Sequence, residues 1–275
     1  MQFAEVNGVT LHYQTIGADK GKPLIVFINS LGSDFRIWRD VVVEIAGKAA
    51  LLTYDKRGHG LSSVGNPPYA MSDHVDDLIA LLEYLSVESA VLCGVSVGGM
   101  IAQGVCARRP DLVSALVLCD TGHRIGTDEM WNERIEKIGQ GGIAALSEPI
   151  LERWFTADFR ENRKAELEGY RNMLTRQPAE GYTGTCAAIR DADFTQDAAN
   201  IAVPVLCVVG DQDGSTPPEL VEELAGLIPD ARFEVIAGAG HLPSIEQPQK
   251  LSSLIKGFLT ANATAAAKQE VGLLH

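Results

Sequence analysis

Residues 94–98, with the sequence Gly-Val-Ser-Val-Gly, hold the side chain best suited to nucleophilic chemistry. They follow an apolar run at residues 91–93, typical of a buried strand, and precede a helix-like segment at residues 97–108. A G-x-S-x-G turn between a strand and a helix exposes its serine hydroxyl at a tight bend, beside N–H groups that favour negative charge. We therefore predict Ser96 as a nucleophile. The alternative is an ordinary Gly/Ser turn.

A serine hydroxyl attacks efficiently only when a base removes its proton. His241 lies in a Gly-rich loop after the last predicted strand, and Asp213 lies in the loop after the strand before it. The order Ser96, Asp213, His241 predicts a triad in which the histidine moves the proton and the carboxylate orients the histidine. Asp211 and Asp120 are alternative acids. We select Asp213 because Asp211 directly ends a strand and can brace the turn.

Two backbone N–H groups are predicted to stabilise the oxyanion that forms during acyl transfer. One belongs to Val97, directly after the nucleophile. The other belongs to Leu31, in an Asn-Ser-Leu-Gly loop at residues 29–32 that follows a predicted strand. The alternative for this loop is a plain strand-to-helix turn in which Asn29 and Ser30 satisfy backbone groups.

A second polar loop, at residues 55–62, reads Asp-Lys-Arg-Gly-His-Gly-Leu-Ser. His59 lies between two glycines, which favours a histidine that holds a tight loop by hydrogen bonds over one that performs chemistry. Asp55 and Arg57 are expected to brace the same turn.

Alternating strand and helix patterns must position these residues. The Asn7-Gly8 pair between two short β-patterned runs predicts an antiparallel hairpin. The later strands alternate with helices, as in parallel βαβ units. We predict an α/β fold with a mostly parallel central sheet, an antiparallel N-terminal hairpin and an inserted helical cap. The predicted strands are residues 2–6, 10–15, 23–28, 50–54, 91–93, 113–118, 204–209 and 232–236.

The pattern changes between residues 127 and 193, where amphipathic helical segments replace buried strands. This change predicts a cap that is inserted into the core. The predicted helical segments are residues 130–138, 143–155, 164–175 and 181–189. The predicted division is a core of residues 1–123 and 195–262, a helical cap of residues 124–194, and a flexible Ala-rich tail of residues 263–275.

Composition excludes several function classes. The chain has 275 residues and a formal net charge of -13, which argues against nucleic acid or an anionic membrane surface as a partner. Cys93, Cys119 and Cys207 lie in apolar runs and are expected to be reduced, which predicts a cytoplasmic protein. No Cys/His spacing or phosphate-binding loop indicates a metal or a nucleotide cofactor.

The motifs at residues 55–60, 94–98, 210–213 and 240–241 make the chain resemble the α/β-hydrolase superfamily over nearly its whole length. Within it, the chain resembles the 3-oxoadipate enol-lactonases of the β-ketoadipate pathway of aromatic catabolism. The resemblance implies an α/β-hydrolase fold, no cofactor, and opening of a small anionic enol-lactone to 3-oxoadipate. It rests on Asn29-Ser30, where the superfamily commonly has His-Gly, and on cap residues 131–134, 154–156, 181–182 and 186–191.

An anionic lactone that approaches an acidic protein needs a local cation. Arg134 is our first candidate for binding the substrate carboxylate and Arg190 is the second, because a guanidinium can hold a carboxylate with two hydrogen bonds. Trp131 and Trp154 are predicted to line the same pocket. The alternative for all four residues is that they only support the cap.

The triad does not distinguish this activity from that of a carboxylesterase, a C–C bond hydrolase or a cofactor-free perhydrolase. A dehalogenase or an epoxide hydrolase would need a carboxylate nucleophile, and Ser96 argues against both. A ligand sensor or scaffold on the same fold is the alternative outside enzymes, and the complete set of Ser96, Asp213 and His241 argues against it. The sequence leaves the oligomeric state open.

Overall fold

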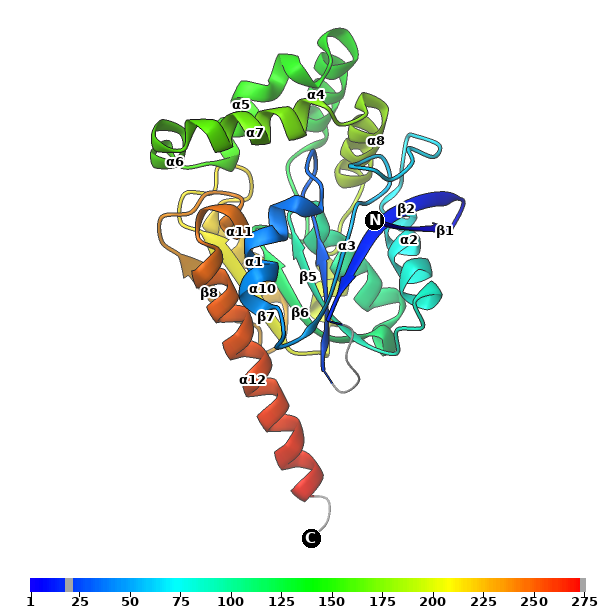
Figure 1. The fold of residues 1–275 in the computed structure, drawn as a ribbon, viewed down its shortest axis with the longest axis vertical. Helices are drawn as coiled ribbons and strands as arrows, with labels where there is room; N and C mark the ends of the chain where they lie inside the picture. The colour runs from blue at the N-terminus through cyan, green and yellow to red at the C-terminus, as the bar shows by residue number, and fades with distance from the viewer. Residues whose placement is uncertain (18–21, 273–275) are drawn as a thin grey trace.

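An eight-stranded β-sheet runs through the middle of the molecule (Figure 1). The computed structural model describes residues 1–17 and 22–272, with side chains described through residue 262. Along the sheet the strands follow the order β1-β2-β4-β3-β5-β6-β7-β8. Their bounds are β1 (Gln2–Val6), β2 (Val9–Ile16), β3 (Leu24–Ile28), β4 (Ala50–Tyr54), β5 (Ala90–Val95), β6 (Val113–Cys119), β7 (Val205–Gly210) and β8 (Arg232–Ile236).

The predicted α/β fold is confirmed. Strand β2 pairs antiparallel with β1 and β4, and all later pairings are parallel. Asn7 and Gly8 both have positive φ, which the two-residue turn of the hairpin requires. Strands β4, β5 and β7 are buried along their whole length, because helices cover both faces of the sheet.

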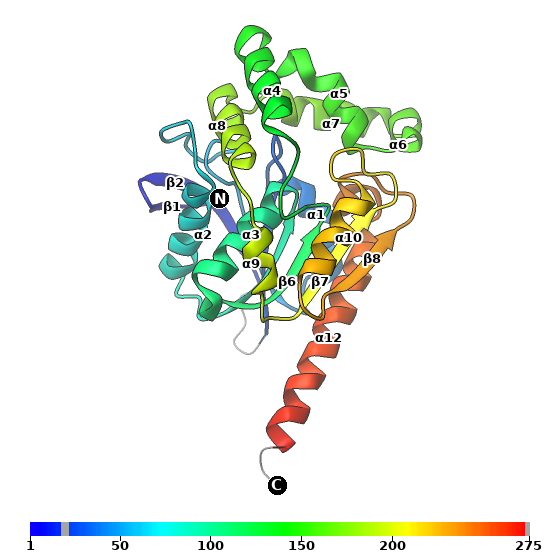
Figure 2. The ribbon, with the colours of Figure 1, turned by 180° about the vertical axis from the view of Figure 1, so that it is seen from behind.

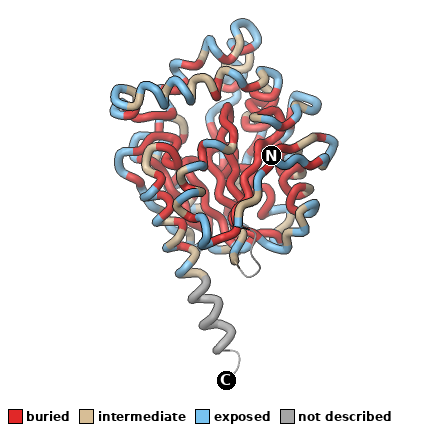
Figure 3. The backbone as a smooth tube through the Cα atoms, viewed as in Figure 1, coloured by how far each residue is buried: buried red, intermediate tan, exposed pale blue. Residues whose placement is uncertain are grey.

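Two layers of helices enclose the sheet (Figures 1 and 2). One face carries α1 (Arg39–Ile45) and α12 (Pro248–Gly272), which pack against each other. The other face carries α2 (Met71–Tyr84), α3 (Val97–Arg108), α9 (Thr195–Ala199) and α10 (Pro218–Leu227). Buried residues concentrate in the sheet between the two layers, as Figure 3 shows. Short helical turns complete the core: η1 (Phe35–Trp38), η2 (Pro110–Leu112) and α11 (Pro243–Glu246).

Five helices between β6 and α9 lie together beyond one end of the sheet (Figure 1). They correspond to the helical segments that the sequence predicted for the cap, with one further helix, α6. Helices α4 and α8 pack against each other, as do α5 and α7. The bounds are α4 (Asp128–Gly141), η3 (Ile143–Leu146), α5 (Ser147–Trp154), α6 (Ala157–Asn162), α7 (Lys164–Thr175) and α8 (Ala179–Arg190).

The flexible tail that the sequence predicts over residues 263–275 stays a prediction. Helix α12 continues through Gly272 and projects beyond the body of the molecule (Figure 1), while residues 273–275 lie outside the described part. Leu251, Ile255 and Phe258 bury the first half of this helix against the core. None of the described helices combines the length and the apolar composition needed to cross a bilayer.

Candidate active site

Ser96 lies in a sharp turn between β5 and α3, with the unusual dihedral angles φ 59° and ψ -124°. The turn is possible because two glycines let backbone segments touch. A Cβ atom on Gly94 would overlap the carbonyl oxygen of Gly98, and one on Gly98 would overlap that of Ile28. Such strained backbone is stored at functional sites when the surrounding structure fixes it.

Hydrogen bonds hold the backbone of Ser96 from both sides. Its N–H donates to the carbonyl oxygens of Cys119 and Asp120, both at 3.1 Å. Its own carbonyl oxygen accepts from the Thr121 hydroxyl at 2.6 Å. These partners lie at the end of β6, the neighbouring strand, and directly after it, so the sheet itself fixes the position of the Ser96 backbone.

Asp213 and His241 form a buried hydrogen-bonded pair. Asp213 Oδ2 lies 2.9 Å from His241 Nδ1 and accepts from the Thr216 hydroxyl at 2.7 Å, while its Oδ1 accepts from the Ser215 N–H at 2.7 Å. Burial alone would raise the pKa of Asp213, but His241 and these donors outweigh burial and lower the pKa below its ordinary value. The carboxylate therefore stays ionised, and His241 keeps Nε2 for another partner.

Ser96 and His241 line one small cavity of about 40 Å³ between the core and the cap. Within the described residues no hydrogen bond joins their side chains. Catalytic hydrogen bonds commonly tighten only when substrate is bound, so the shared cavity is the relevant observation. A cap residue also holds the backbone of the histidine, because the main-chain N–H of His241 donates to the carbonyl oxygen of Trp154 at 2.9 Å.

Leu31 lines the same cavity. Val97 directly follows Ser96 and begins α3. Among the hydrogen bonds of the described residues, neither the Leu31 N–H nor the Val97 N–H has a protein acceptor. Both groups are thus free to bind a developing oxyanion.

The two alternative acids have other partners. Asp211 is exposed and accepts from the Gly238 N–H at 2.8 Å, so it braces a turn as expected. Asp120 is fully buried and accepts from the Gly210 N–H at 2.8 Å. One side-chain atom of each of Asp120, Asp213 and His241 lies within 4.8 Å of the others. Burial first, and then the charge of Asp213, raise the pKa of Asp120 well above its ordinary value, which favours its neutral form beside the pair.

His59 holds a loop, as the sequence indicated. Its Nε2 accepts from the Gly32 N–H at 3.0 Å, and its Nδ1 lies 3.2 Å from the carbonyl oxygen of Arg57. This arrangement requires a neutral imidazole. Burial is the main reason why the pKa of His59 lies well below its ordinary value.

The buried histidines make stability depend on pH. Burial lowers the pKa of both His59 and His74, so the unfolded chain binds protons at these sites where the folded chain does not. The free energy of unfolding should therefore fall by about 1.4 kcal/mol per pH unit for each histidine as the pH drops from about 6.5 to 5. Chemical denaturation across that range measures the slope. His59→Asn should remove the contribution of His59 to this slope. An unchanged slope in that variant would contradict the conclusion that buried His59 has a lowered pKa.

The structure brings three of the four predicted cap residues into the cavity. Trp131, Arg134 and Trp154 all line it. The Arg134 guanidinium lies over the Trp131 ring, 4.8 Å from its centroid, and the Trp131 indole N–H donates to the carbonyl oxygen of Ile125 at 2.7 Å. Both contacts fix the arginine at the cavity wall.

The fourth residue, Arg190, does not line the cavity. Its guanidinium pairs with Asp191 through two hydrogen bonds and donates to the Asn132 side chain at 2.7 Å. The structure therefore does not bring Arg190 to the cavity with the other three predicted cap residues. At the end of α8, the guanidinium of Arg190 forms an ion pair with the adjacent carboxylate of Asp191.

Sequence reasoning missed several residues of the site. Arg153 and Tyr182 line the cavity from α5 and α8, and Thr216 contacts both members of the Asp213–His241 pair. A signal existed for Thr216, which follows Asp213 by three residues in the same loop. The amphipathic pattern of the cap helices places Arg153 and Tyr182 on helices without indicating which side faces the core.

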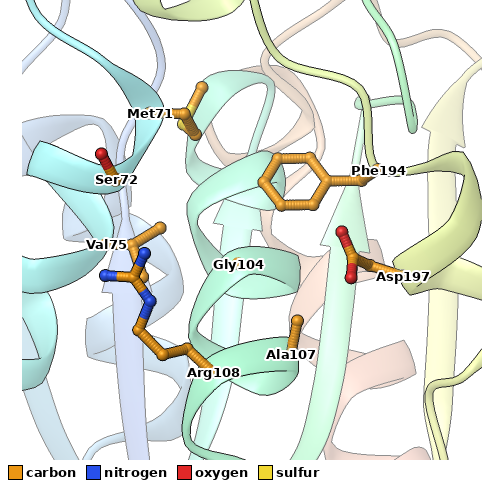
Figure 4. A pocket seen from close by; sticks show the side chains of 8 residues that line it. All are labelled: Met71, Ser72, Val75, Gly104, Ala107, Arg108, Phe194 and Asp197. Atoms are coloured by element: carbon orange, nitrogen blue, oxygen red, sulfur yellow. The ribbon is translucent and has the colours of Figure 1, made fainter.

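A second hollow, of about 320 Å³, lies on the flank between α2, α3 and α9 (Figure 4). Its charged residues are Arg108, which pairs with Asp76, and Asp197. None of the predicted catalytic residues lines it. The cavity beside Ser96 is therefore the candidate active site.

Comparisons with known proteins agree with this geometry. Residues 25–254 match the Alpha/beta hydrolase family. The chain is similar to 3-oxoadipate enol-lactonase 2 of Acinetobacter baylyi, with 31% identity over 91% of this chain and 93% of that protein. It is also similar to the crystal structure of the enol-lactonase from Burkholderia xenovorans, with 36% identity, a TM-score of 0.91, and coverage of 94% of this chain and 100% of that one.

A thermophilic esterase from Thermogutta terrifontis, solved with malate bound, is similar at 26% identity and a TM-score of 0.89, with coverage of 95% of this chain and 99% of that one. These likenesses span nearly the full length of each chain and include the cap. The chain belongs to the alpha/beta hydrolase family, and its relatives include enol-lactonases.

Proposed function

We propose that this hydrolase opens a small anionic enol-lactone, 3-oxoadipate enol-lactone, to 3-oxoadipate through an acyl-enzyme. The Arg134 guanidinium at the cavity wall carries the proposal. The described residues that line this cavity include two arginines, Arg134 and Arg153, and no acidic residue. In a chain of net charge -13, this local excess of positive charge favours an anionic substrate.

In the first half of the reaction, Ser96 Oγ attacks the lactone carbonyl carbon while His241 Nε2 takes its proton. The N–H groups of Leu31 and Val97 stabilise the oxyanion, and Asp213 stabilises the imidazolium. Collapse of the tetrahedral intermediate breaks the ring C–O bond. His241 returns the proton to the departing enol oxygen, and the enol then tautomerises to the ketone.

In the second half, His241 deprotonates a water molecule that attacks the acyl-enzyme carbonyl. Collapse of this second intermediate breaks the bond to Ser96 Oγ, which regains its proton from His241. The product carries a new carboxylate, and Arg153 is a second cation that lines the cavity.

The similarity to enol-lactonases supports the assignment to the β-ketoadipate pathway, and the five free, buried cysteines support action in the cytoplasm.

Replacing Arg134 with alanine should lower kcat/KM for the anionic enol-lactone by about 10- to 100-fold, because a charge-assisted hydrogen bond to a carboxylate is lost. The same variant should change kcat/KM for neutral p-nitrophenyl acetate far less. The rate of lactone opening is measured as the loss of the ultraviolet absorbance of the enol-lactone. Arg190→Ala is the matched control, since its pair with Asp191 lies outside the cavity, and its kcat/KM should stay within about twofold of wild type.

Equal losses on both substrates in Arg134→Ala would remove its proposed role. If wild-type enzyme hydrolyses only p-nitrophenyl acetate, the chain is a carboxylesterase and the lactone assignment fails. If neither substrate reacts, the alternative of a ligand sensor or scaffold on the same fold is favoured.

A further inference from the structure

Lys56 is buried beneath the loop that supplies one of the proposed oxyanion donors. It directly follows Asp55 in the loop after β4, and it is 1% exposed. Its ammonium donates to the carbonyl oxygen of Ser30 at 2.6 Å and approaches that of Asn29 at 3.4 Å. Among the described residues no carboxylate forms a salt bridge with it. Lysine is almost never fully buried without an ionic partner, so this placement requires an explanation.

The contact with Ser30 acts on the reacting site through a single peptide group. The carbonyl of Ser30 and the N–H of Leu31 belong to the same planar unit and point in opposite directions. Fixing the oxygen therefore fixes the direction of the N–H of Leu31, a residue that lines the same cavity as Ser96. The positive charge of the ammonium beside this oxygen also polarises the peptide and strengthens its N–H as a donor.

The other partners of this loop are neutral. The Ser30 carbonyl oxygen also accepts from the Ser33 hydroxyl at 2.8 Å, and the Asn29 amide donates to the carbonyl oxygen of Ser33 at 2.5 Å. The Gly32 N–H donates to neutral His59. Lys56 is therefore the one charged side chain among the described hydrogen-bond partners of residues 29–33.

We infer that Lys56 is a positioning residue for catalysis, which orients and polarises the Ser30–Leu31 peptide so that its N–H stabilises the oxyanion. This inference rests on the proposed serine mechanism. It does not depend on the lactone, because every acyl substrate forms the same oxyanion.

The cost of burial supports a functional role over a structural one. Burial lowers the pKa of Lys56 to about 7, although the carboxylates of Asp55 and Asp34 raise it. A methionine of similar length would avoid this desolvation and would leave the Ser30 carbonyl with its bond from Ser33. Lys56→Met should therefore keep or raise the melting temperature, whereas loss of a purely structural contact would lower it.

Lys56→Met should lower kcat by about 10- to 100-fold with little change in KM, on both the enol-lactone and p-nitrophenyl acetate, because the lost interaction acts in the transition state. Affinity for a trifluoromethyl ketone, which forms an oxyanion adduct with serine, should fall by the same factor. Lys56→Gln, which retains an uncharged donor, gives a second test if the methionine variant fails to fold, and its kcat should also fall. Val41→Ala, a buried change in α1, is the control for lost stability and should keep kcat.

Unchanged kcat in the Lys56 variants would overturn the inference. So would a melting temperature that falls while KM rises and kcat holds. Ser96→Ala separates this failure from failure of the proposed mechanism. If Ser96→Ala is inactive and Lys56→Met is fully active, the serine mechanism stands and only the role of Lys56 is wrong.

Discussion

Ser96→Ala should fold normally and lose hydrolysis of both the enol-lactone and p-nitrophenyl acetate by at least about 10³-fold. The fold should persist because alanine keeps the Cβ atom that serine already carries at φ 59°, so the backbone strain does not change. The bonds that hold this turn use the backbone N–H and carbonyl of residue 96, and alanine retains both. Activity should be lost because no covalent intermediate can form.

Labelling by a fluorophosphonate, which reacts with an activated serine, measures the same property without a substrate. Wild-type protein should be labelled and Ser96→Ala should not. Ser72→Ala is a matched control, since Ser72 is exposed and lines the separate hollow in Figure 4. Turnover near the wild-type level in Ser96→Ala would exclude the serine mechanism. Loss of turnover in Ser72→Ala would place chemistry in the flank hollow instead.

Asp213→Asn should reduce kcat by about 10⁴-fold while leaving the protein folded. The amide matches the carboxylate in shape and can still accept from the N–H groups of Ser215 and Thr216. It cannot stabilise the imidazolium, and its NH₂ group would favour the tautomer of His241 that carries the proton on Nε2. That tautomer cannot accept the proton of Ser96.

Asp120→Asn is the matched control for this prediction. The raised pKa of Asp120 favours its neutral form, and its carboxyl accepts from the Gly210 N–H; an asparagine can reproduce both the neutral charge and this bond. Its kcat should therefore remain within about threefold of wild type, as expected for a substitution without charge change. If Asp120→Asn loses more activity than Asp213→Asn, the acid that orients His241 is the one after β6.

The main catalytic candidates could be predicted from the sequence because their signals are local. The glycines around Ser96 are required by contacts within a few residues and with the next strand, and the order of strands and loops places Asp213 and His241 at strand ends. Parallel strands bring their carboxyl ends to one edge of the sheet, so residues that are distant in sequence meet there. The choice of Asp213 over Asp211 followed from turn chemistry; in the structure Asp213 contacts His241, and Asp211 accepts from the Gly238 N–H.

The cap residues could not be predicted as reliably, because helical periodicity does not tell which neighbour a long side chain will reach. Arg134 and Arg190 have the same chemistry and both lie on cap helices. Only packing places one over Trp131 at the cavity and lets Asp191 hold the other outside it. Arg153 lacked any local signal, since its role depends on how α5 approaches the loop of His241.

The sequence by itself determined the α/β fold, the parallel sheet with its N-terminal hairpin, and the residues expected to act as nucleophile, acid and base, because periodicity, turn chemistry and chain order are properties of short segments. Tertiary structure decided which arginine lines the cavity, placed Asp120 close to the Asp213–His241 pair, and brought Lys56 against the Ser30 carbonyl. These outcomes depend on burial and on contacts between segments that are far apart in the chain, and no local pattern records either.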